Sequence, residues 1–398
     1  MPVELRPLGV KCNIACKYCY QHPQRAAGNQ ARSYNIESMK SAIEREGGSF
    51  TLFGGEPLLL PERDLEELWS WGFQRSGSNS VQTNGTTINE NHIRMFRQYK
   101  VQVGISMDGP GELNSLRWAG SPERTAEATE RTQAAIERLC REGIVPTLIV
   151  TMHRINAEAS RLPRLIEWLA NFDALGVTYV RLHILESEEE SIRGRYGLST
   201  AENVEAFLAL ARLERSLPRL RFDLFADMRS LLMGRDKNVT CLWTACDPYT
   251  TASVRGVEGH GQRSNCGRVN KDGIDYVKAD SPGFERYLVL YSTPWNFGGC
   301  SGCRFFLICK GQCPGTAIDG DWRNRTEHCE VWKQLLEFTE QELIASGKSP
   351  LTAQPALRER LERLMIDSWS RRQNPALETL LESIQPAAAL PSAAPTVS

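Results

Sequence analysis

Short apolar runs rich in β-branched residues alternate with longer amphipathic segments over roughly the first 220 residues. The strand candidates are residues 4–11, 49–53, 80–83, 101–106, 145–152 and 177–184. The helix candidates are residues 36–46, 62–74, 89–99, 122–142, 159–172 and 200–216. Repeated alternation of strand and helix predicts an α/β domain with a parallel sheet, either a partly closed barrel or an open doubly wound sheet.

The alternation stops near residue 225, where the composition changes. The following segment is rich in Gly, Asn and Asp and holds eight of the twelve cysteines, from Cys241 to Cys329. Because it has few long apolar runs, we expect bound metal to stabilise it. Helical patterns return at 330–345 and 353–384, before a Pro/Ala/Ser-rich end. We expect a barrel core at 1–222, a cysteine-rich domain at 223–335, C-terminal helices at 336–384 and a disordered tail at 385–398.

The charge balance argues against two classes of partner. The 47 basic and 48 acidic side chains give a formal net charge of -1, so no overall field favours nucleic acid or an anionic membrane. The N-terminus lacks a basic segment leading into an apolar run, and later apolar runs are far shorter than the roughly 20 residues that span a bilayer. We expect a cytoplasmic protein whose twelve cysteines are ligands or catalysts rather than structural disulfides.

Chemically distinctive residues follow each predicted strand. In chain order they are Cys12, Cys16 and Cys19; Gly54 to Pro57; Thr83 to Gly85; Ser106 to Gly109; His153; and finally His183 with Glu186. Since the carboxyl ends of parallel strands meet at one edge of a sheet, we expect these residues to gather on one face of the domain.

Three thiolates spaced CxxxCxxC suit a [4Fe-4S] cluster whose fourth iron has no protein ligand, with a zinc site completed by a distant ligand as the alternative. Gly54 and Gly55 would let the backbone approach a ligand, or serve only a turn. Glu56 could accept hydrogen bonds from an amino group, or cap the next helix. Asn84 and Ser106 could fix a ribose or a carboxylate.

These segments resemble the radical S-adenosylmethionine (SAM) enzymes. "CNIACKYC" fits their cluster motif, "FGGEP" resembles their methionine-amine motif, and "QTNG" and "ISMDGP" resemble their ribose-contacting segments. The resemblance covers residues 5–220 and implies a partial (β/α)6 barrel with SAM bound at the open iron. It implies cofactor contacts from Tyr18, Gly54, Gly55, Glu56, Asn84 and Ser106. By analogy Arg117 contacts the SAM carboxylate, with a surface arginine as the alternative, while His153 and His183 receive no role.

The later cysteines resemble those of the SPASM domain, a C-terminal extension that holds two auxiliary [4Fe-4S] clusters. The resemblance implies one cluster on Cys241, Cys246, Cys266 and Cys313 and the other on Cys300, Cys303, Cys309 and Cys329. A pair of zinc knuckles is the alternative. Cys140 is then the one cysteine left over, and it lies on the apolar face of a predicted helix as a small hydrophobe.

The combined resemblance implies a peptide maturase that cleaves SAM reductively to a 5′-deoxyadenosyl radical and abstracts a substrate hydrogen. Sulfatase maturases of this family carry an aspartate after the third auxiliary cysteine, where this chain has Gly267. The run from 246 to 273 is most similar to maturases of ribosomally made peptides, and among them to spliceases that excise tyramine to leave an α-keto-β-amide.

Implied partners are a precursor peptide and a low-potential electron donor such as flavodoxin or ferredoxin. A separate leader-binding protein joins them, because only eleven residues precede Cys12 and leave no room for a leader-binding domain. Two alternatives stay open. One is a maturase of a folded protein or small molecule, such as a sulfatase or a quinone cofactor precursor, and the other is a non-catalytic iron-sulfur or zinc scaffold.

Overall fold

The computed structural model describes residues 3–28, 33–247, 249–250, 254–269 and 281–384. The predicted disordered tail at 385–398 lies outside the described residues, as do parts of the run from 246 to 273.

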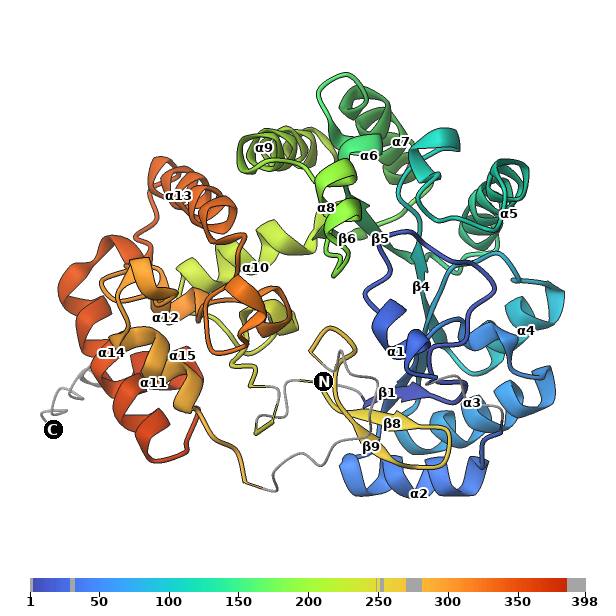
Figure 1. Cartoon of the computed structure of the whole chain (residues 1–398), viewed down its shortest axis with the longest axis horizontal. Coiled ribbons are helices and arrows are strands. Elements are labelled where there is room, and N and C mark those ends of the chain that lie inside the picture. The colour runs from blue at the N-terminus through green and yellow to red at the C-terminus, as the bar shows by residue number, and fades with distance from the viewer. Residues whose placement is uncertain (1–2, 29–32, 248, 251–253, 270–280, 385–398) are drawn as a thin grey trace, which may run out of the picture.

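A single sheet of nine strands organises the described residues (Figure 1). Its order is β7-β6-β5-β4-β3-β2-β1-β8-β9. The strands are β1 Val3–Arg6, β2 Phe50–Leu52, β3 Asn79–Thr83, β4 Val101–Ser106, β5 Thr147–Met152, β6 Tyr179–Ile184, β7 Arg221–Phe222, β8 Gly256–Glu258 and β9 Arg263–Ser264. All neighbours pair in parallel except β8 and β9, which are antiparallel. The predicted parallel core of a partial barrel is confirmed.

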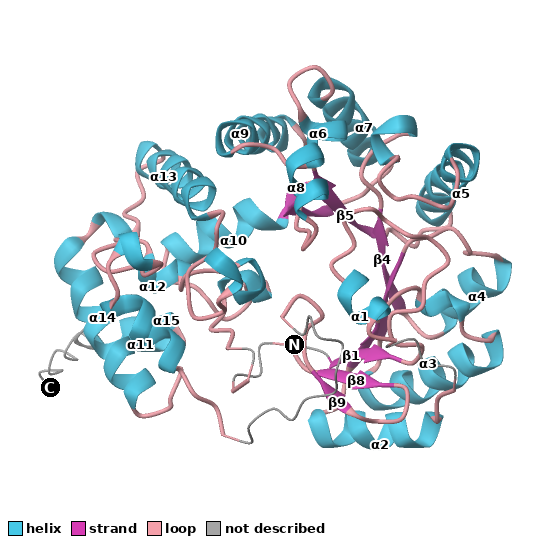
Figure 2. Ribbon diagram, viewed as in Figure 1, coloured by secondary structure: helices cyan, strands magenta, loops and turns pink. Residues whose placement is uncertain are grey.

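Amphipathic helices cover the outer face of this curved sheet (Figure 2). They are α2 Ile36–Glu46, α3 Glu62–Ser76, α4 Glu90–Gln98, α5 Pro122–Arg141, α7 Leu162–Ala174 and α9 Thr200–Ser216. Local signals set their ends. Asn35 caps the start of α2 and Gly47, at φ 104°, ends it, while Ser199 and Glu202 form a capping box at the start of α9. Short helices occupy the loops: α1 His22–Ala26, α6 Arg154–Ala157 and α8 Glu190–Tyr196.

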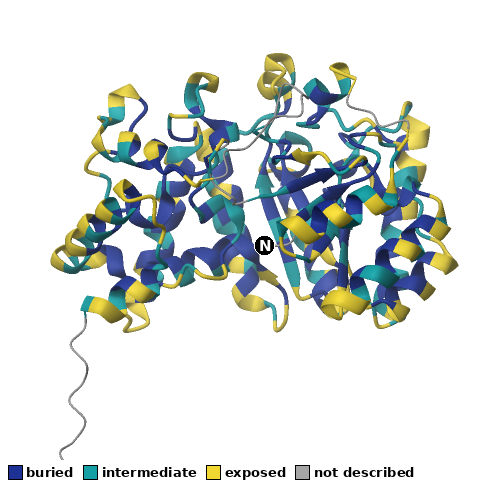
Figure 3. Cartoon of the chain, turned by 90° about the horizontal axis from the view of Figure 1, so that it is seen from below, coloured by how far each residue is buried: buried dark blue, intermediate teal, exposed yellow. Residues whose placement is uncertain are grey.

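Strand side chains divide between the two faces of the sheet with the expected period of two. In β1, Val3 and Leu5 pack into the hydrophobic core under the helices, while Glu4 and Arg6 point to the inner face. The same alternation in β6 buries Val180 and Leu182 and turns other residues inward. Figure 3 shows the result, with exposed residues on the outer helix surfaces and buried ones on the sheet.

The C-terminal part forms a second group of helices, on the opposite side of the molecule from helices α2, α3, α4 and α5 (Figure 1). It comprises α10 Asp223–Leu232, α11 Glu285–Ser292, α12 Phe306–Cys309, α13 Cys329–Ala345, α14 Pro355–Ser370 and α15 Leu377–Ile384. Single 3-10 turns are η1 Pro57–Leu59, η2 Gly111–Asn114, η3 Cys241–Trp243, η4 Trp295–Phe297, η5 Pro314–Thr316, η6 Ile318–Gly320 and η7 Leu351–Ala353. The α10 helix packs on β6 and α13, so one hydrophobic core runs through both parts.

Two features differ from the sequence-based prediction. The expected helix at 353–384 is broken between α14 and α15, where Arg372 takes φ 59° and Pro375 follows. The strands β7, β8 and β9 were not predicted, and β8 joins the sheet beside β1. The sheet therefore includes strands from both sides of the expected domain boundary at residue 222. The domain boundaries remain a prediction. No helix among the described residues has the length and apolar character needed to cross a bilayer.

Candidate functional site

A cavity of about 260 Å³ opens at the inner face of the sheet, where the parallel strands end. Inward-facing strand residues line it, including Glu4, Gln82, Ser106, Thr151 and His183. Seven cysteines from two distant parts of the chain complete the wall: Cys12, Cys16, Cys19, Cys241, Cys246, Cys266 and Cys313. The expectation that the strand-end residues gather on one face holds for most of them.

The first cysteine set lies on the loop between β1 and α1. Two backbone hydrogen bonds hold this loop: Ala15 N donates to the Trp118 oxygen at 2.7 Å, and Lys17 N donates to the Leu116 oxygen at 2.8 Å. Asn84 Nδ2 donates to Cys12 Sγ at 3.8 Å, and Arg25 Nη2 donates to Cys19 Sγ at 3.9 Å. Burial raises the pKa of Cys16 to about 12 and also raises the pKa of Cys12, so these two thiols are protonated until a metal displaces the proton.

Gly54 and Gly55 line the cavity and let two loops pack against each other. The N–H groups of Gly55 and Glu56 donate to the backbone oxygens of Gly9 at 3.1 Å and Lys11 at 2.8 Å. A Cβ on Gly55 would lie 2.0 Å from the Lys11 oxygen, and Gly54 takes φ +125°. The glycines are therefore required for this loop contact, which fixes the cysteine loop from below.

The structure shows the bonds that Glu56 makes within the protein. Its carboxylate caps the η1 turn by accepting from Leu58 N at 3.0 Å, and also accepts from Thr83 Oγ1 and Asn84 N, both at 2.7 Å. The side chain is 1% exposed and is not part of the cavity wall. Burial raises its pKa to about 7. Glu56 thus ties the end of β3 to the second loop and caps η1, while its expected bond to an amino group stays a prediction.

Asn84 and Ser106 lie on the cavity wall as expected. Asn84 Nδ2 donates to Asn13 Oδ1 at 2.8 Å, and its Oδ1 accepts from Thr86 N at 3.0 Å, so its amide is fixed beside the cysteine loop. Ser106 Oγ accepts from Gln82 Nε2 at 2.9 Å. Gln82, the first residue of the "QTNG" segment, also lines the cavity and faces the same way as Asn84, although it was not assigned a cofactor contact from the sequence.

Tyr18 and Arg117 meet at a buried carboxylate. Asp108, 0% exposed, accepts from the Tyr18 hydroxyl and from Thr151 N at 2.9 Å, and pairs with Arg117 Nε at 3.2 Å. His153 Nε2 lies 3.6 Å from the same carboxylate. Despite its burial, the Arg117 charge and its other partners lower the Asp108 pKa to about 2. Arg117 lines the cavity and is not a surface arginine.

The eight later cysteines form two groups in space. Burial raises the pKa values of seven of them, and neighbouring thiols in the same group raise several of these pKa values further. One group is Cys241, Cys246, Cys266 and Cys313, and the other is Cys300, Cys303, Cys309 and Cys329. These groups coincide with the two implied ligand sets, and only the first lines the cavity. Cys140 is partly buried on α5 and packs against the core.

A charged cluster on the far wall of the cavity was not assigned a role from the sequence. Arg268, two residues after Cys266, contacts His183 Nδ1 at 2.8 Å and Glu186 Oε1 at 3.2 Å. Burial and nearby arginines lower the pKa of His183 well below its usual value, so His183 is neutral, and Nδ1 accepts from Arg268. The cluster places a guanidinium between the end of β6 and the first later cysteine group.

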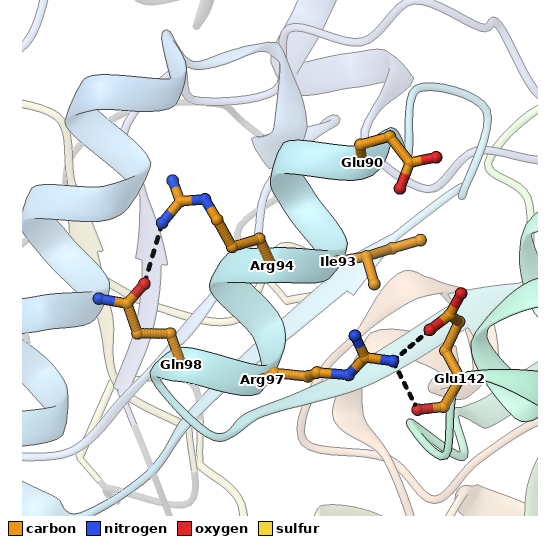
Figure 4. Close-up of a pocket in the computed structure, with 6 residues that line it drawn as sticks. All are labelled: Glu90, Ile93, Arg94, Arg97, Gln98 and Glu142. Atoms are coloured by element: carbon orange, nitrogen blue, oxygen red, sulfur yellow. Dashed lines mark hydrogen bonds and ion pairs between the residues drawn. The ribbon is translucent and has the colours of Figure 1, made fainter.

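A larger hollow of about 450 Å³ lies on the outer surface beside α4 (Figure 4). Its charges are already paired, since Arg97 binds Glu142, Arg94 pairs with Glu66 at 3.1 Å, and Glu90 pairs with Arg138. It belongs to the helix layer rather than the inner face of the sheet, and it holds none of the residues singled out by the motifs. The cysteine-lined cavity is therefore the candidate site.

Comparison with known proteins identifies the family of the barrel. Residues 7–162 match the model of the Radical SAM superfamily. The chain carries a radical SAM domain. Such a domain implies a [4Fe-4S] cluster and SAM, and the three thiols at one end of the cavity fit that requirement.

Curated proteins similar to this chain include two kinds of maturase. A serine-type anaerobic sulfatase-maturating enzyme from Klebsiella aerogenes is 28% identical over 218 residues, which cover 52% of this chain and 52% of that protein. A cysteine-type anaerobic sulfatase-maturating enzyme from Clostridium perfringens is 31% identical over 160 residues, which cover 34% of this chain and 42% of that protein. The chain spans about half the length of the curated relatives it matches.

Solved structures share the fold over a longer stretch. Native anSMEcpe with bound AdoMet matches 87% of this chain and 98% of that chain, with a TM-score of 0.66 at 21% identity. Streptococcus suis SuiB bound to precursor peptide SuiA matches 83% and 76%, with a TM-score of 0.53 at 15% identity. The shared fold therefore extends beyond the radical SAM barrel into the C-terminal part.

The surroundings of the cysteine groups suit anionic clusters. Thiolate-ligated clusters carry net negative charge, which a buried guanidinium offsets. Arg25 lies at the first set, Arg268 acts on Cys313, and Arg325 acts on Cys329. Among the described residues, no group of three or more His, Cys, Asp or Glu side chains is arranged around a single metal ion.

Proposed function

We propose that this radical SAM chain is a maturase that modifies a peptide segment by hydrogen abstraction. The observation that carries the proposal is the shared cavity, in which the three-thiol set and one four-thiol set face the same space. When bound there, SAM and its cluster would supply a 5′-deoxyadenosyl radical. An iron-sulfur cluster held by the four-thiol set of the same cavity would accept an electron from the substrate radical or return one.

The residues that the sequence motifs singled out each have a part in this proposal. Cys12, Cys16 and Cys19 would hold the SAM-binding cluster, leaving one iron open to the cavity. Tyr18, Gly54, Gly55, Asn84, Ser106 and Arg117 would surround SAM, and Glu56 would act indirectly by holding Asn84 in place. The Asp108 ion pair fixes the Arg117 guanidinium, so that this cation is preorganised for a carboxylate. The two groups of later cysteines would hold the auxiliary clusters.

A peptide substrate is supported by the fold neighbours, which include anSMEcpe with bound Cp18Cys peptide and SuiB bound to precursor peptide SuiA. Sulfatase maturation is a second candidate, because the curated relatives carry that name. One contact disfavours it. A Cβ on Gly267 would lie 2.8 Å from Tyr20 Cε2, so an acidic side chain after Cys266 has no room unless Tyr20 moves. Tyramine excision from a ribosomally made precursor is the finer form of our proposal.

Metal and SAM assays test the catalytic part. Anaerobic reconstitution should give about twelve irons per chain, and reduction should cleave SAM to 5′-deoxyadenosine. Cys16→Ala should abolish SAM cleavage while keeping the auxiliary clusters. Cys140→Ala is the matched control and should keep both. Bound zinc without SAM cleavage would refute the enzyme and favour the scaffold alternative.

Mass spectrometry tests the substrate. The chain should be incubated with three kinds of peptide: a short precursor encoded beside it, a Cys-containing sulfatase peptide and a Ser-containing sulfatase peptide. We expect a mass change in the precursor alone, with release of tyramine if splicing occurs. Deuterium incorporation from solvent should be measured as well, because epimerisation leaves the mass unchanged. Conversion of a sulfatase peptide alone would establish the second candidate instead.

A further inference from the structure

A buried arginine at the end of β1 joins the two cysteine-bearing parts of the chain. Arg6 is 1% exposed and pairs in parallel register with Glu258 of β8, so the two side chains project from the same face of the sheet. Their ion pair measures 3.0 Å between Arg6 Nη2 and Glu258 Oε1. A buried cation is stable only when paired and hydrogen-bonded, so this arrangement is costly to keep for packing alone.

The same guanidinium reaches the loop that carries Cys266. Arg6 Nη2 donates to Ser264 Oγ at 2.6 Å and to the backbone oxygen of Asn265 at 2.5 Å. That oxygen belongs to the peptide bond leading into Cys266. Ser264 Oγ in turn donates to Glu258 Oε1 at 2.7 Å, which closes the network. A residue of the barrel thus holds the backbone beside a cysteine of the later group.

A glycine makes this contact possible. A Cβ on Gly256 would lie 2.6 Å from Arg6 Nη2 and 2.3 Å from Ser264 Oγ, so any larger residue would displace the guanidinium. The charge of Arg6 also acts on the thiol itself, since Cys266 is one of the groups that interact with the guanidinium. Arg6 therefore combines a geometric constraint on the loop with a positive charge close to Cys266.

We propose that Arg6 is a positioning residue for the later cysteine group in the cavity, fixing the Cys266 loop against the barrel and raising the reduction potential of the cluster held there. Position and charge both matter, because the potential of an iron-sulfur cluster depends on nearby charge and hydrogen bonding. The inference rests on the proposed cluster assignment, but it does not depend on the substrate.

The test uses the full chain in which Cys12, Cys16 and Cys19 are replaced by Ala, so that only the auxiliary clusters contribute. In this background Arg6→Gln removes the positive charge and the hydrogen bonds to Ser264 and Asn265. Arg6→Lys keeps the charge but not these hydrogen bonds. The matched control is Arg154→Gln, which breaks a 2.7 Å ion pair with Glu202 on the barrel surface. Each variant is reconstituted anaerobically, and iron content, electron paramagnetic resonance spectra and redox titrations are recorded.

We expect about eight irons per chain in the background and the control. Arg6→Gln should lower the midpoint potential of one cluster and alter its spectrum, or reduce the iron to about four per chain. Arg6→Lys should restore the potential towards that of the background while leaving the spectrum altered. If Arg6→Gln does not fold, Ser264→Ala, which removes the two hydrogen bonds of the Ser264 hydroxyl and no charge, should alter the same spectrum with a smaller change in potential.

The outcomes separate this inference from the proposed function. A background with no later cluster refutes the cluster assignment and, with it, the role of Arg6. A background with about eight irons, whose potential and spectrum are the same in Arg6→Gln, refutes the role of Arg6 alone. An equal change of potential and spectrum in Arg154→Gln would also refute the role of Arg6, because the effect would then reflect general destabilisation.

Discussion

The buried carboxylate of Asp108 offers a quantitative test of the site. Replacing it with asparagine keeps the shape but removes the charge that faces Arg117, whose side chain is 10% exposed. Asn cannot form an ion pair, and its amide would place donors towards the Tyr18 hydroxyl and Arg117. The substitution should therefore leave a buried guanidinium without a counter-charge.

Two estimates give the expected loss in the free energy of unfolding. The Asp108 pKa is lowered from 3.8 to about 2, and at about 1.4 kcal/mol per unit this shift corresponds to about 2 kcal/mol of stability at neutral pH. Removing one partner of a buried ion pair typically costs about 3–5 kcal/mol. We expect Asp108→Asn to lower the free energy of unfolding by about 3 kcal/mol. With about 2 cal/mol/K of unfolding entropy per residue, that loss lowers the melting temperature by about 4 °C.

The assay is urea and thermal unfolding of the metal-free protein under reducing conditions, followed by circular dichroism. Glu112→Gln is the control, because its partner Arg164 is exposed and such pairs contribute under about 1 kcal/mol. Because the folded pKa of Asp108 is depressed, its contribution is present above pH 3.8 and is lost as the pH falls towards 2. A loss in Asp108→Asn no larger than that of the control would refute the reasoning.

Three further predictions concern the loops and the clusters. Gly55→Ala should weaken iron binding at the first cysteine set, because the added Cβ would lie 2.0 Å from the Lys11 backbone oxygen. Gly194→Ala is the control and should bind iron normally, since nothing lies within 4 Å of a Cβ at that position. Equal iron contents in the two variants would contradict the prediction. The Glu56 pKa is raised from 4.5 to about 7, so its contribution to stability is present below pH 4.5 and is lost as the pH rises through 7. Urea unfolding should show that the free energy of unfolding falls by up to about 3 kcal/mol between pH 5 and pH 7.5, and Glu56→Gln should lack this fall. The same pH dependence in the two proteins would refute the burial argument. Removing iron with a chelator should lower the unfolding temperature in calorimetry, and equal temperatures would show that the clusters do not stabilise the C-terminal part.

The sequence predicted those elements whose signals are local. The helices at 36–46 and 200–216 and the strand at 101–106 have the expected bounds, because capping residues and apolar periodicity lie within each segment. By contrast, β8 and β9 are three and two residues long, and β8, on which β9 pairs, has its other partner β1 some 250 positions away. So short a strand has no periodicity of its own, and only pairing with a distant strand defines it.

The site shows the same division. The motifs correctly placed Asn84, Ser106 and the glycines at the cavity, since strand ends in a parallel sheet converge. They did not indicate the bonds that Glu56 accepts from Thr83 and Asn84, because these groups become close only in the folded chain. The surface alternative for Arg117 failed for a similar reason, since its burial depends on Asp108.

The sequence by itself determined the barrel class, the order of motifs at the strand ends and the division of cysteines by spacing, because each depends on residue type and local order. The tertiary structure decided which cysteine group shares the cavity with the first set. It also decided that Arg6 reaches the Cys266 loop. Such contacts join residues far apart in the chain, and no local pattern specifies the distance between them.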